Sequence, residues 1–214
     1  MGILLEVQRR LESLYGLDHE TPVTDFLISE DEARAYPGDG SRTLVSEDGG
    51  GVALGVILDD TVGQKLAQAD PRVRLDASNL GPFCTLTEEV SHFVYLLFCA
   101  HAARSVTELE LELQGEVDKY LSATFLLSLQ NEGAVSASLR RLLFREYRLA
   151  EKVSLARAER YNLASDLAYR YCGFLEQRFL RSSRSSRLED LAREARRFYR
   201  LGQREKLERI AGLQ

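Results

Sequence analysis

The segment from Thr85 to Ala103 constrains the fold of this chain more than any other. It predicts a helix whose apolar residues recur at helical spacing and cover much of its girth. These residues are Val90, Phe93, Val94, Leu96, Leu97 and Cys99. A helix that is apolar on most of its faces has to be covered by other elements, because water would otherwise contact those side chains. We therefore expect this helix to be central in the fold.

The residues before this helix predict a mixture of helix and short strands. Residues 2–15 have apolar positions at helical spacing, and Gly16 ends that pattern. Alternation and turn residues then predict strands at Val23–Ser29, Thr43–Ser46 and Gly51–Leu58, the last two joined as a hairpin by residues 47–51. Asp59 or Asp60 can cap a short helix that ends near Ala69. Residues 70–82 then predict a connecting loop.

The residues after the central helix are predicted to be helical throughout. A second long helix is expected over residues 107–129, followed by a break at Asn131–Gly133. The rest, up to Leu213, predicts three or four helices, with breaks near Ser154 and at Arg181–Arg187. The predicted class is therefore α+β, with an N-terminal part over residues 1–133 and an all-helical part over residues 134–214.

Three polar residues in the middle of the central helix predict chemistry. They are Glu88, Glu89 and His92, in the order Glu-Glu-x-x-His. In the His-Glu-x-x-His motif, two histidines one helical turn apart bind zinc, and the glutamate beside the first acts as general base. Glu88 stands at the place of the first histidine and His92 at that of the second. Glu89 stands at the place of the catalytic base.

The next helix extends this pattern to a family resemblance. Its sequence Leu113-Gln-Gly-Glu-Val-Asp-Lys-Tyr120 is similar to the pattern Glu-x-x-Ala-Asn-x-Phe-Ala. Together with the Glu-Glu-x-x-His segment, it makes residues 85–127 resemble the short metallopeptidases of the ImmA/IrrE type. This resemblance implies a compact zincin-like domain over residues 1–133, with a helix, a short antiparallel sheet and two helices that carry ligands. It also implies that Glu116 is the third metal ligand and that Glu89 is catalytic.

The departures from the family pattern shape the expected function. Known members cleave or inactivate repressor proteins, but here Glu88 replaces a histidine and Val117 replaces a small residue. The resemblance therefore implies a metallopeptidase-like protein with degenerate or pseudoenzymatic catalysis, which acts by recognising a partner protein. If it is active, the expected activity is that of a metal-dependent peptidase.

The spacing of the acidic residues is compatible with one divalent metal ion. Glu88 and His92 are four residues apart and share a helix face, and Glu112 and Glu116 do so on the next helix. The predicted ligands are Glu88, His92 and Glu116, with Glu112 as a further candidate. Two carboxylates and one imidazole shift the expected metal from zinc towards manganese or iron.

Two other interpretations of the same residues remain open. Thr85-x-x-Glu88 has the form of a capping box, which would make Glu88 a helix-start residue, and Thr107-x-x-Glu110 has the same form. Glu89-x-x-His92 is also the ligand pair of di-iron carboxylate bundles. A complete site of that kind would need a second pair, which a symmetric dimer can supply.

Charge divides the chain unevenly. Residues 1–138 hold 9 Lys and Arg against 23 Asp and Glu, a formal charge of −14, whereas residues 139–214 hold 19 against 10, a charge of +9. Seventeen of those 19 cations are arginine, which binds carboxylates and phosphates in bidentate fashion. The candidate binding residues are Arg140, Arg141, Arg148, Arg193 and Arg197.

This charge division supports a second hypothesis, a non-enzymatic adaptor whose arginine-rich helices bind an acidic protein or a nucleic acid. The competing interpretation is that these arginines pair with the protein's own carboxylates and that the basic helices pack on the acidic part. We favour this pairing with the protein's own carboxylates over nucleic-acid binding.

The sequence also predicts where the protein works. It has no apolar run of the roughly 18 residues that a membrane span requires. Its three cysteines, Cys84, Cys99 and Cys172, lack metal-type spacing and predict buried thiols in a reducing compartment. We expect a cytoplasmic protein that does not enter the membrane.

Overall fold

The computed structural model describes residues 2–18, 20–48, 51–133, 136, 138–146, 155–180 and 186–213. It is mostly helical with one two-stranded antiparallel sheet, so the α+β class is confirmed in its coarse form. The chain divides into two compact units, which are treated separately below. The first comprises Met1–Ser13 and Leu17–Ser105, and the second comprises Leu14–Gly16 and Val106–Gln214. This division falls at Ser105 and not at the predicted residue 133, so the second long helix belongs to the C-terminal unit.

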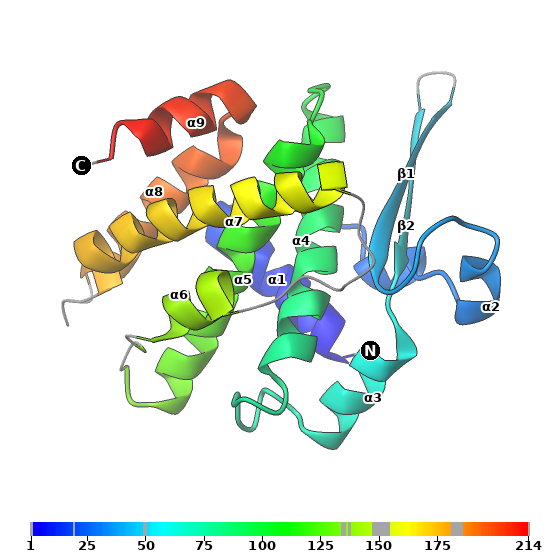
Figure 1. Cartoon of the computed structure of the whole chain (residues 1–214), viewed down its shortest axis with the longest axis horizontal. Coiled ribbons are helices and arrows are strands. Elements are labelled where there is room, and N and C mark those ends of the chain that lie inside the picture. Colours follow the sequence, from blue (N-terminus) through cyan, green and yellow to red (C-terminus); the bar gives the residue numbers. More distant parts are fainter. Residues whose placement is uncertain are drawn as a thin grey trace. The chain divides into compact units, whose positions relative to one another are not determined.

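The first unit contains helices at both ends and a small sheet between them (Figure 1). Its elements are α1 (Gly2–Tyr15), a 3-10 helix (Val23–Phe26), α2 (Glu30–Ala33), β1 (Arg42–Asp48), β2 (Gly51–Ile57), α3 (Asp60–Gln68) and α4 (Leu80–His101). Helix α1 is confirmed, and Gly16 ends it with a φ of 62°, a conformation that glycine adopts without strain. Asp59 caps α3 as predicted, because its carboxylate accepts from the Thr61 backbone NH at 2.8 Å.

The strand predicted at Val23–Ser29 is wrong. Val23–Phe26 forms a 3-10 helix, and only Leu27 makes an isolated parallel bridge to Val56 of β2. Local hydrogen bonds explain the difference. The side chain of Gln8 accepts from the Val23 backbone NH, and Ser29 forms a capping box with Glu32 at the start of α2. Side chains that satisfy nearby backbone groups in this way compete with strand pairing.

The predicted hairpin is confirmed, with β1 and β2 antiparallel and Thr43 paired with Val56. Two of its turn residues, Gly49 and Gly50, lie outside the described residues. Val56 is fully buried, whereas Val45 and Val52, farther along the hairpin, are about half exposed. Both strands contact α4, so the base of the hairpin is anchored on the central helix of this unit.

Helix α4 is central, as its apolar residues predict. Phe93 and Val90 are completely buried, and the ring of Phe93 packs against that of Phe26 with centroids 5.0 Å apart. The predicted start at Thr85 is wrong, because the helix begins at Leu80 and includes Pro82 in its first turn. Proline is tolerated there since its missing NH has no partner inside the helix. Glu88 therefore lies in the helix interior, and the capping box predicted with Thr85 is also wrong.

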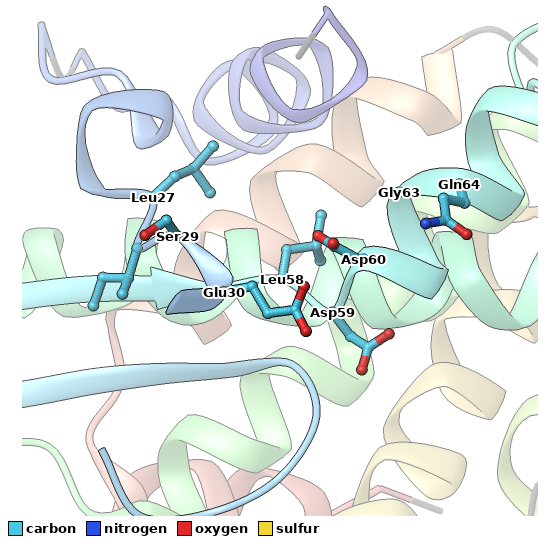
Figure 2. A pocket seen from close by; sticks show the side chains of 9 residues that line it. Leu27, Ser29, Glu30, Leu58, Asp59, Asp60, Gly63 and Gln64 are labelled. Carbon is cyan, nitrogen blue, oxygen red and sulfur yellow. The ribbon is translucent and has the colours of Figure 1, made fainter. Parts of the chain in front are cut away.

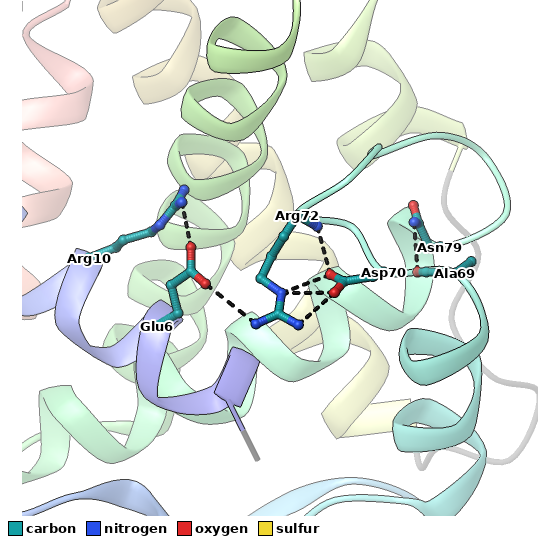
Figure 3. Close-up of polar contacts among 6 residues, drawn as sticks. All are labelled: Glu6, Arg10, Ala69, Asp70, Arg72 and Asn79. Atoms are coloured by element: carbon teal, nitrogen blue, oxygen red, sulfur yellow. Dashed lines mark hydrogen bonds and ion pairs between the residues drawn. The ribbon is translucent and has the colours of Figure 1, made fainter.

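Polar contacts fix the loop that leads into α4 (Figure 3). The Asn79 side chain donates to the backbone oxygens of Ala69 and Arg74 and accepts from the Asp76 backbone NH. Arg72 pairs with Asp70 at 2.6 Å and lies 3.9 Å from a carboxylate oxygen of Glu6. Asn79 directly precedes α4, so these bonds set where the helix begins.

The described residues of the second unit form helices and no strands, as predicted for the C-terminal part. Its elements are α5 (Glu108–Gln130), α6 (Leu139–Arg141), a π-helix (Leu142–Glu146), α7 (Leu155–Leu175), a second π-helix (Glu176–Leu180), α8 (Ser186–Arg200) and α9 (Gln203–Ala211). Thr107 caps α5 as predicted, and the break after it is confirmed by positive φ angles at Glu132 and Gly133. Of the other predicted breaks, Ser154 and residues 181–185 lie outside the described residues.

Helices α5 and α7 form the main helix pair of this unit, and a buried polar chain runs beside them. Lys206 of α9 is fully buried and donates to Gln114 at 2.8 Å, and Gln114 donates to Asp118 at 3.0 Å. Tyr15 also donates to Asp118, and burial together with that carboxylate raises the pKa of Tyr15 well above its usual range. These bonds tie α5 and α9 together at the level of their side chains.

The loop before α4 gives a test of this account of the fold. Replacement Asn79→Ala removes the partners of three backbone groups around a buried position, each costing about 1–3 kcal/mol. We expect the free energy of unfolding to fall by at least about 2 kcal/mol in urea denaturation. The control is Asn131→Ala, which removes one exposed bond to Leu127 and should cost under about 1 kcal/mol. Equal losses in the two variants would contradict the role given to Asn79.

Candidate metal centre

Helix α4 places Glu88 and His92 one turn apart on the same face. His92 has only 6% of its surface exposed, and Glu88 is half-buried. The neighbouring positions Val90, Phe93 and Val94 are held in the core. Because α4 is continuous from Leu80 to His101, the backbone positions of Glu88 and His92 are fixed one helical turn apart. The spacing that the sequence predicts is therefore present.

Glu89 lies beside this pair and is held by the sheet. Its exposed fraction is 6%, and its Oε2 accepts a hydrogen bond of 2.8 Å from the Thr43 hydroxyl of β1. The same hydroxyl is 3.4 Å from the Glu89 backbone oxygen. Oε2 of Glu89 is 4.0 Å from Nδ1 of His92, which leaves Nε2 as the imidazole nitrogen that faces away from this carboxylate.

Glu88 and His92 are two side chains of the kind that ligate metal ions, and both come from one helix. Their ligand atoms lie within 4.8 Å of each other. Glu112, the further predicted ligand, lies on α5 in the second unit. Its part in the same site therefore stays a prediction.

Glu116, the other predicted ligand on α5, also belongs to the second unit. Its carboxylate pairs with Lys119 at 2.9 Å, and both side chains are only 10–13% exposed. Glu112 and Glu116 share a face of α5, so sequence spacing alone did not separate them. Lys119, one turn after Glu116, is the feature that distinguishes Glu116 from Glu112 in the sequence. The role of Glu116 as a ligand stays a prediction.

The residues that match the second family pattern have structural contacts. Asp118 accepts hydrogen bonds from Tyr15 and Gln114, and Tyr120 is buried with its pKa raised, mainly by burial and by the nearby Cys172. These contacts give both residues a role in packing the second unit. They are sufficient to explain why an acid and an aromatic residue occupy these positions.

The candidate arginines differ in their surroundings. Arg140 is 19% exposed, pairs with Glu176 at 2.9 Å and lies 4.2 Å from the centroid of the Tyr169 ring. Arg140 is therefore a packing residue. Arg141 and Arg193 are exposed, in ion pairs with Glu146 and Asp190. Arg197 is also exposed, and Arg148 lies outside the described residues. Exposed pairs contribute only about 0–1 kcal/mol, so a polyanion can replace such carboxylates, and polyanion binding stays a prediction.

A cavity that the sequence did not predict lies between α2 and α3 (Figure 2). It measures about 560 Å³ and is lined by the acidic residues Glu30, Asp59 and Asp60 together with Leu27 and Leu58. A hydrogen bond and charge repulsion from Asp60 raise the pKa of Glu30. Glu30 and Asp60 come from segments about 30 residues apart in the sequence, so no local motif marks this cavity.

Comparisons with protein-family models, with curated proteins and with solved structures found no match to this chain. No helix among the described residues is long and apolar enough to cross a membrane. The function therefore has to be argued from the geometry around α4.

The cysteines give a test that is independent of the metal. All three are buried, as predicted, and none forms a disulfide. Burial and the charge of Glu116 raise the pKa of the Cys172 thiol well above its usual range. At pH 8 the reactive thiolate should be scarce, since a pKa raised by one unit lowers its population about tenfold.

We expect Cys172 in the native protein to react with iodoacetamide at least about tenfold more slowly than in guanidinium-unfolded protein at pH 8, followed by mass spectrometry. Raising the pH should accelerate its labelling as the thiolate forms. Equal rates in the folded and unfolded protein would show that this thiol is accessible.

Proposed function

We propose that this protein binds one divalent metal ion through Glu88 and His92, with Glu112 as the expected third ligand, and is a metallopeptidase-like protein that acts on a partner protein. The observation that carries the proposal is the pair Glu88 and His92, one turn apart on α4 with ligand atoms within 4.8 Å of each other. It is supported by the helix start at Leu80, because Glu88 lies inside α4 and has no capping role. The family resemblance of residues 85–127 agrees with such a site but is not needed for it.

Electrostatics favours a cation beside Glu88. Glu88 is half-buried and His92 has only 6% of its surface exposed. Low solvent exposure weakens the screening of a carboxylate charge, so a nearby cation is attracted more strongly than in water. A neutral imidazole adds a nitrogen ligand without adding charge.

The donor set indicates which metals are suited to the site. Zinc prefers histidine and cysteine ligands, whereas carboxylate oxygens suit manganese and, with imidazole, iron. The replacement of a histidine by Glu88 therefore favours Mn²⁺ or Fe²⁺ relative to a two-histidine site. When bound, such an ion would supply Lewis-acid polarisation of a carbonyl group.

The residues around the donors determine what else the site can do. Glu89 is close to His92, with its Oε2 4.0 Å from Nδ1 of the imidazole. A carboxylate in this position can accept a proton, which is the role that the resemblance implies for it. We propose recognition of a partner protein as the main activity, with hydrolysis depending on Glu89 if it occurs.

Metal analysis tests the proposal directly. We expect purified protein incubated with Mn²⁺ or Zn²⁺ and then desalted to retain about one ion per chain, measured by elemental analysis. Replacements His92→Ala and Glu112→Gln should each weaken binding by at least about 100-fold in calorimetric titration, since even indirect partners of ligands contribute 10–100-fold.

Glu116→Gln is the matched control for Glu112→Gln. It removes a carboxylate from the same face of α5, but one that is paired with Lys119. Its metal affinity should stay near that of the wild type. An equal loss in the two variants would assign the third ligand to Glu116 as well, and the absence of bound metal in the wild type would refute the proposed function.

A separate experiment addresses catalysis. If the metal-loaded wild type hydrolyses fluorescently labelled casein, Glu89→Gln should lower the rate by about 10²–10⁴-fold, because the amide cannot take up the proton. Its metal content should remain about one ion per chain. Metal binding without any hydrolysis in the wild type would leave recognition alone as the function of the site.

A further inference from the structure

We propose that helix α8 presents an arginine stripe that binds an acidic segment of a partner protein. The stripe consists of Arg193, Arg197 and Arg200, which all belong to the second unit. None of the proposed metal ligands lies on this helix. The inference therefore goes beyond the metal site, and it can fail while the proposed function stands.

The buried face of α8 fixes the direction in which the stripe points. Leu191, Ala195 and Phe198 have at most 2% of their surface exposed. They recur at positions i, i+4 and i+7 and so form one side of the helix. The three arginines have the same spacing but are offset by two residues, which is roughly 200° around a helix with about 100° per residue. The stripe therefore lies on the side of α8 opposite its buried face.

The guanidinium groups of the stripe are only partly neutralised within the protein. Arg193 pairs with Asp190 at 2.7 Å, with side chains that are 76% and 49% exposed. Arg200 donates to two backbone oxygens, which carry no net charge. Within the part of the chain that the structure describes, the exposed Arg197 side chain makes no hydrogen bond or ion pair. Positive charge is therefore uncompensated in the middle of the stripe.

Arg200 adds a fixed charge to the stripe. Its side chain donates at 3.0 Å to the backbone oxygen of Tyr15, a buried residue of the same unit. The Tyr15 ring stacks on that of Tyr199, with centroids 3.9 Å apart. Because the acceptor is held in the core, the Arg200 side chain is already ordered. A partner that binds beside it loses less side-chain entropy than it would at a mobile arginine.

The chemistry of the stripe favours carboxylates as its partners. A planar guanidinium group binds a carboxylate in bidentate fashion. Exposed ion pairs such as that between Arg193 and Asp190 contribute little to stability, so a carboxylate of a partner can replace Asp190 at low cost. From Arg193 to Arg200 the stripe is about 10 Å long at 1.5 Å per residue, which matches about two turns of an acidic helix.

A nucleic acid is less suited to this surface. Glu189 and Asp190 are exposed in the first described turns of α8, and Glu205 and Glu208 are exposed on α9. These carboxylates repel a phosphate backbone that continues beyond the stripe. Proteins that bind DNA tightly neutralise about 6–10 phosphates, more than three arginines can contact. A short acidic segment of a protein meets neither constraint.

The test measures binding of a fluorescently labelled polyglutamate peptide to the full chain by fluorescence anisotropy at low salt. We expect binding that weakens as salt is added, because salt screens exposed charges. Arg197→Glu should lower the affinity at least about tenfold, since it replaces a charge-assisted hydrogen bond by repulsion. Arg197→Lys keeps the charge but lacks the planar fork, so its affinity should lie between those of the wild type and Arg197→Glu.

Arg141→Glu is the matched control. Arg141 is exposed, lies on α6 in the same unit and pairs with Glu146, so its replacement changes the net charge by the same amount. Its affinity for the peptide should stay within about twofold of that of the wild type, because a charge outside the contact acts only through a screened field. Circular dichroism checks that the variants keep their helical content.

The outcomes separate this proposal from the metal site. Equal losses in Arg197→Glu and Arg141→Glu would overturn it, because binding would then follow net charge and not the stripe. Absence of peptide binding by the wild type at low salt would also overturn it. Tighter binding of duplex DNA than of the peptide, lost in Arg197→Glu, would overturn the choice of an acidic protein as partner. None of these results depends on bound metal, which is measured separately.

Discussion

The burial of helix α4 is the constraint on which the other features of the site depend. Its apolar side chains require cover on most faces, yet the same turns carry Glu88, Glu89 and His92. Burying ionisable groups is costly unless charge or hydrogen bonds compensate. The structure provides a hydrogen-bond donor from Thr43 for Glu89, and Glu88 shares its helix face with the imidazole of His92.

The two glutamates of α4 thus have different surroundings although they are adjacent in the sequence. Successive residues of a helix point in directions about 100° apart, so Glu88 and Glu89 meet different neighbours. Glu89 faces β1 and Thr43, whereas Glu88 shares its face with His92. This divergence separates the proposed ligand Glu88 from the proposed proton acceptor Glu89 within a single helical turn. The metal experiment and the Glu89 experiment therefore probe different residues.

Salt bridges inside the C-terminal unit weaken the adaptor hypothesis. Arg140 is bound to Glu176 and stacked on Tyr169, and Arg160 pairs with Glu108 at 2.5 Å. The buried Lys206 donates to Gln114 in the same unit. Part of the basic charge is therefore used in packing the helices. The proposed docking of the basic part on the acidic part stays a prediction, as does binding of a partner by Arg141, Arg193 and Arg197.

The sequence by itself determined the helices α1, α4 and α5, the hairpin, the helix caps Asp59 and Thr107, and the shared face of Glu88 and His92. These features depend on local periodicity and on side chains that bond within a few residues. Tertiary structure alone decided the start of α4 at Leu80, the 3-10 helix at Val23–Phe26 and the bond from Thr43 to Glu89. Each of these depends on side-chain partners outside the element itself, and helical or strand periodicity contains no information about such partners.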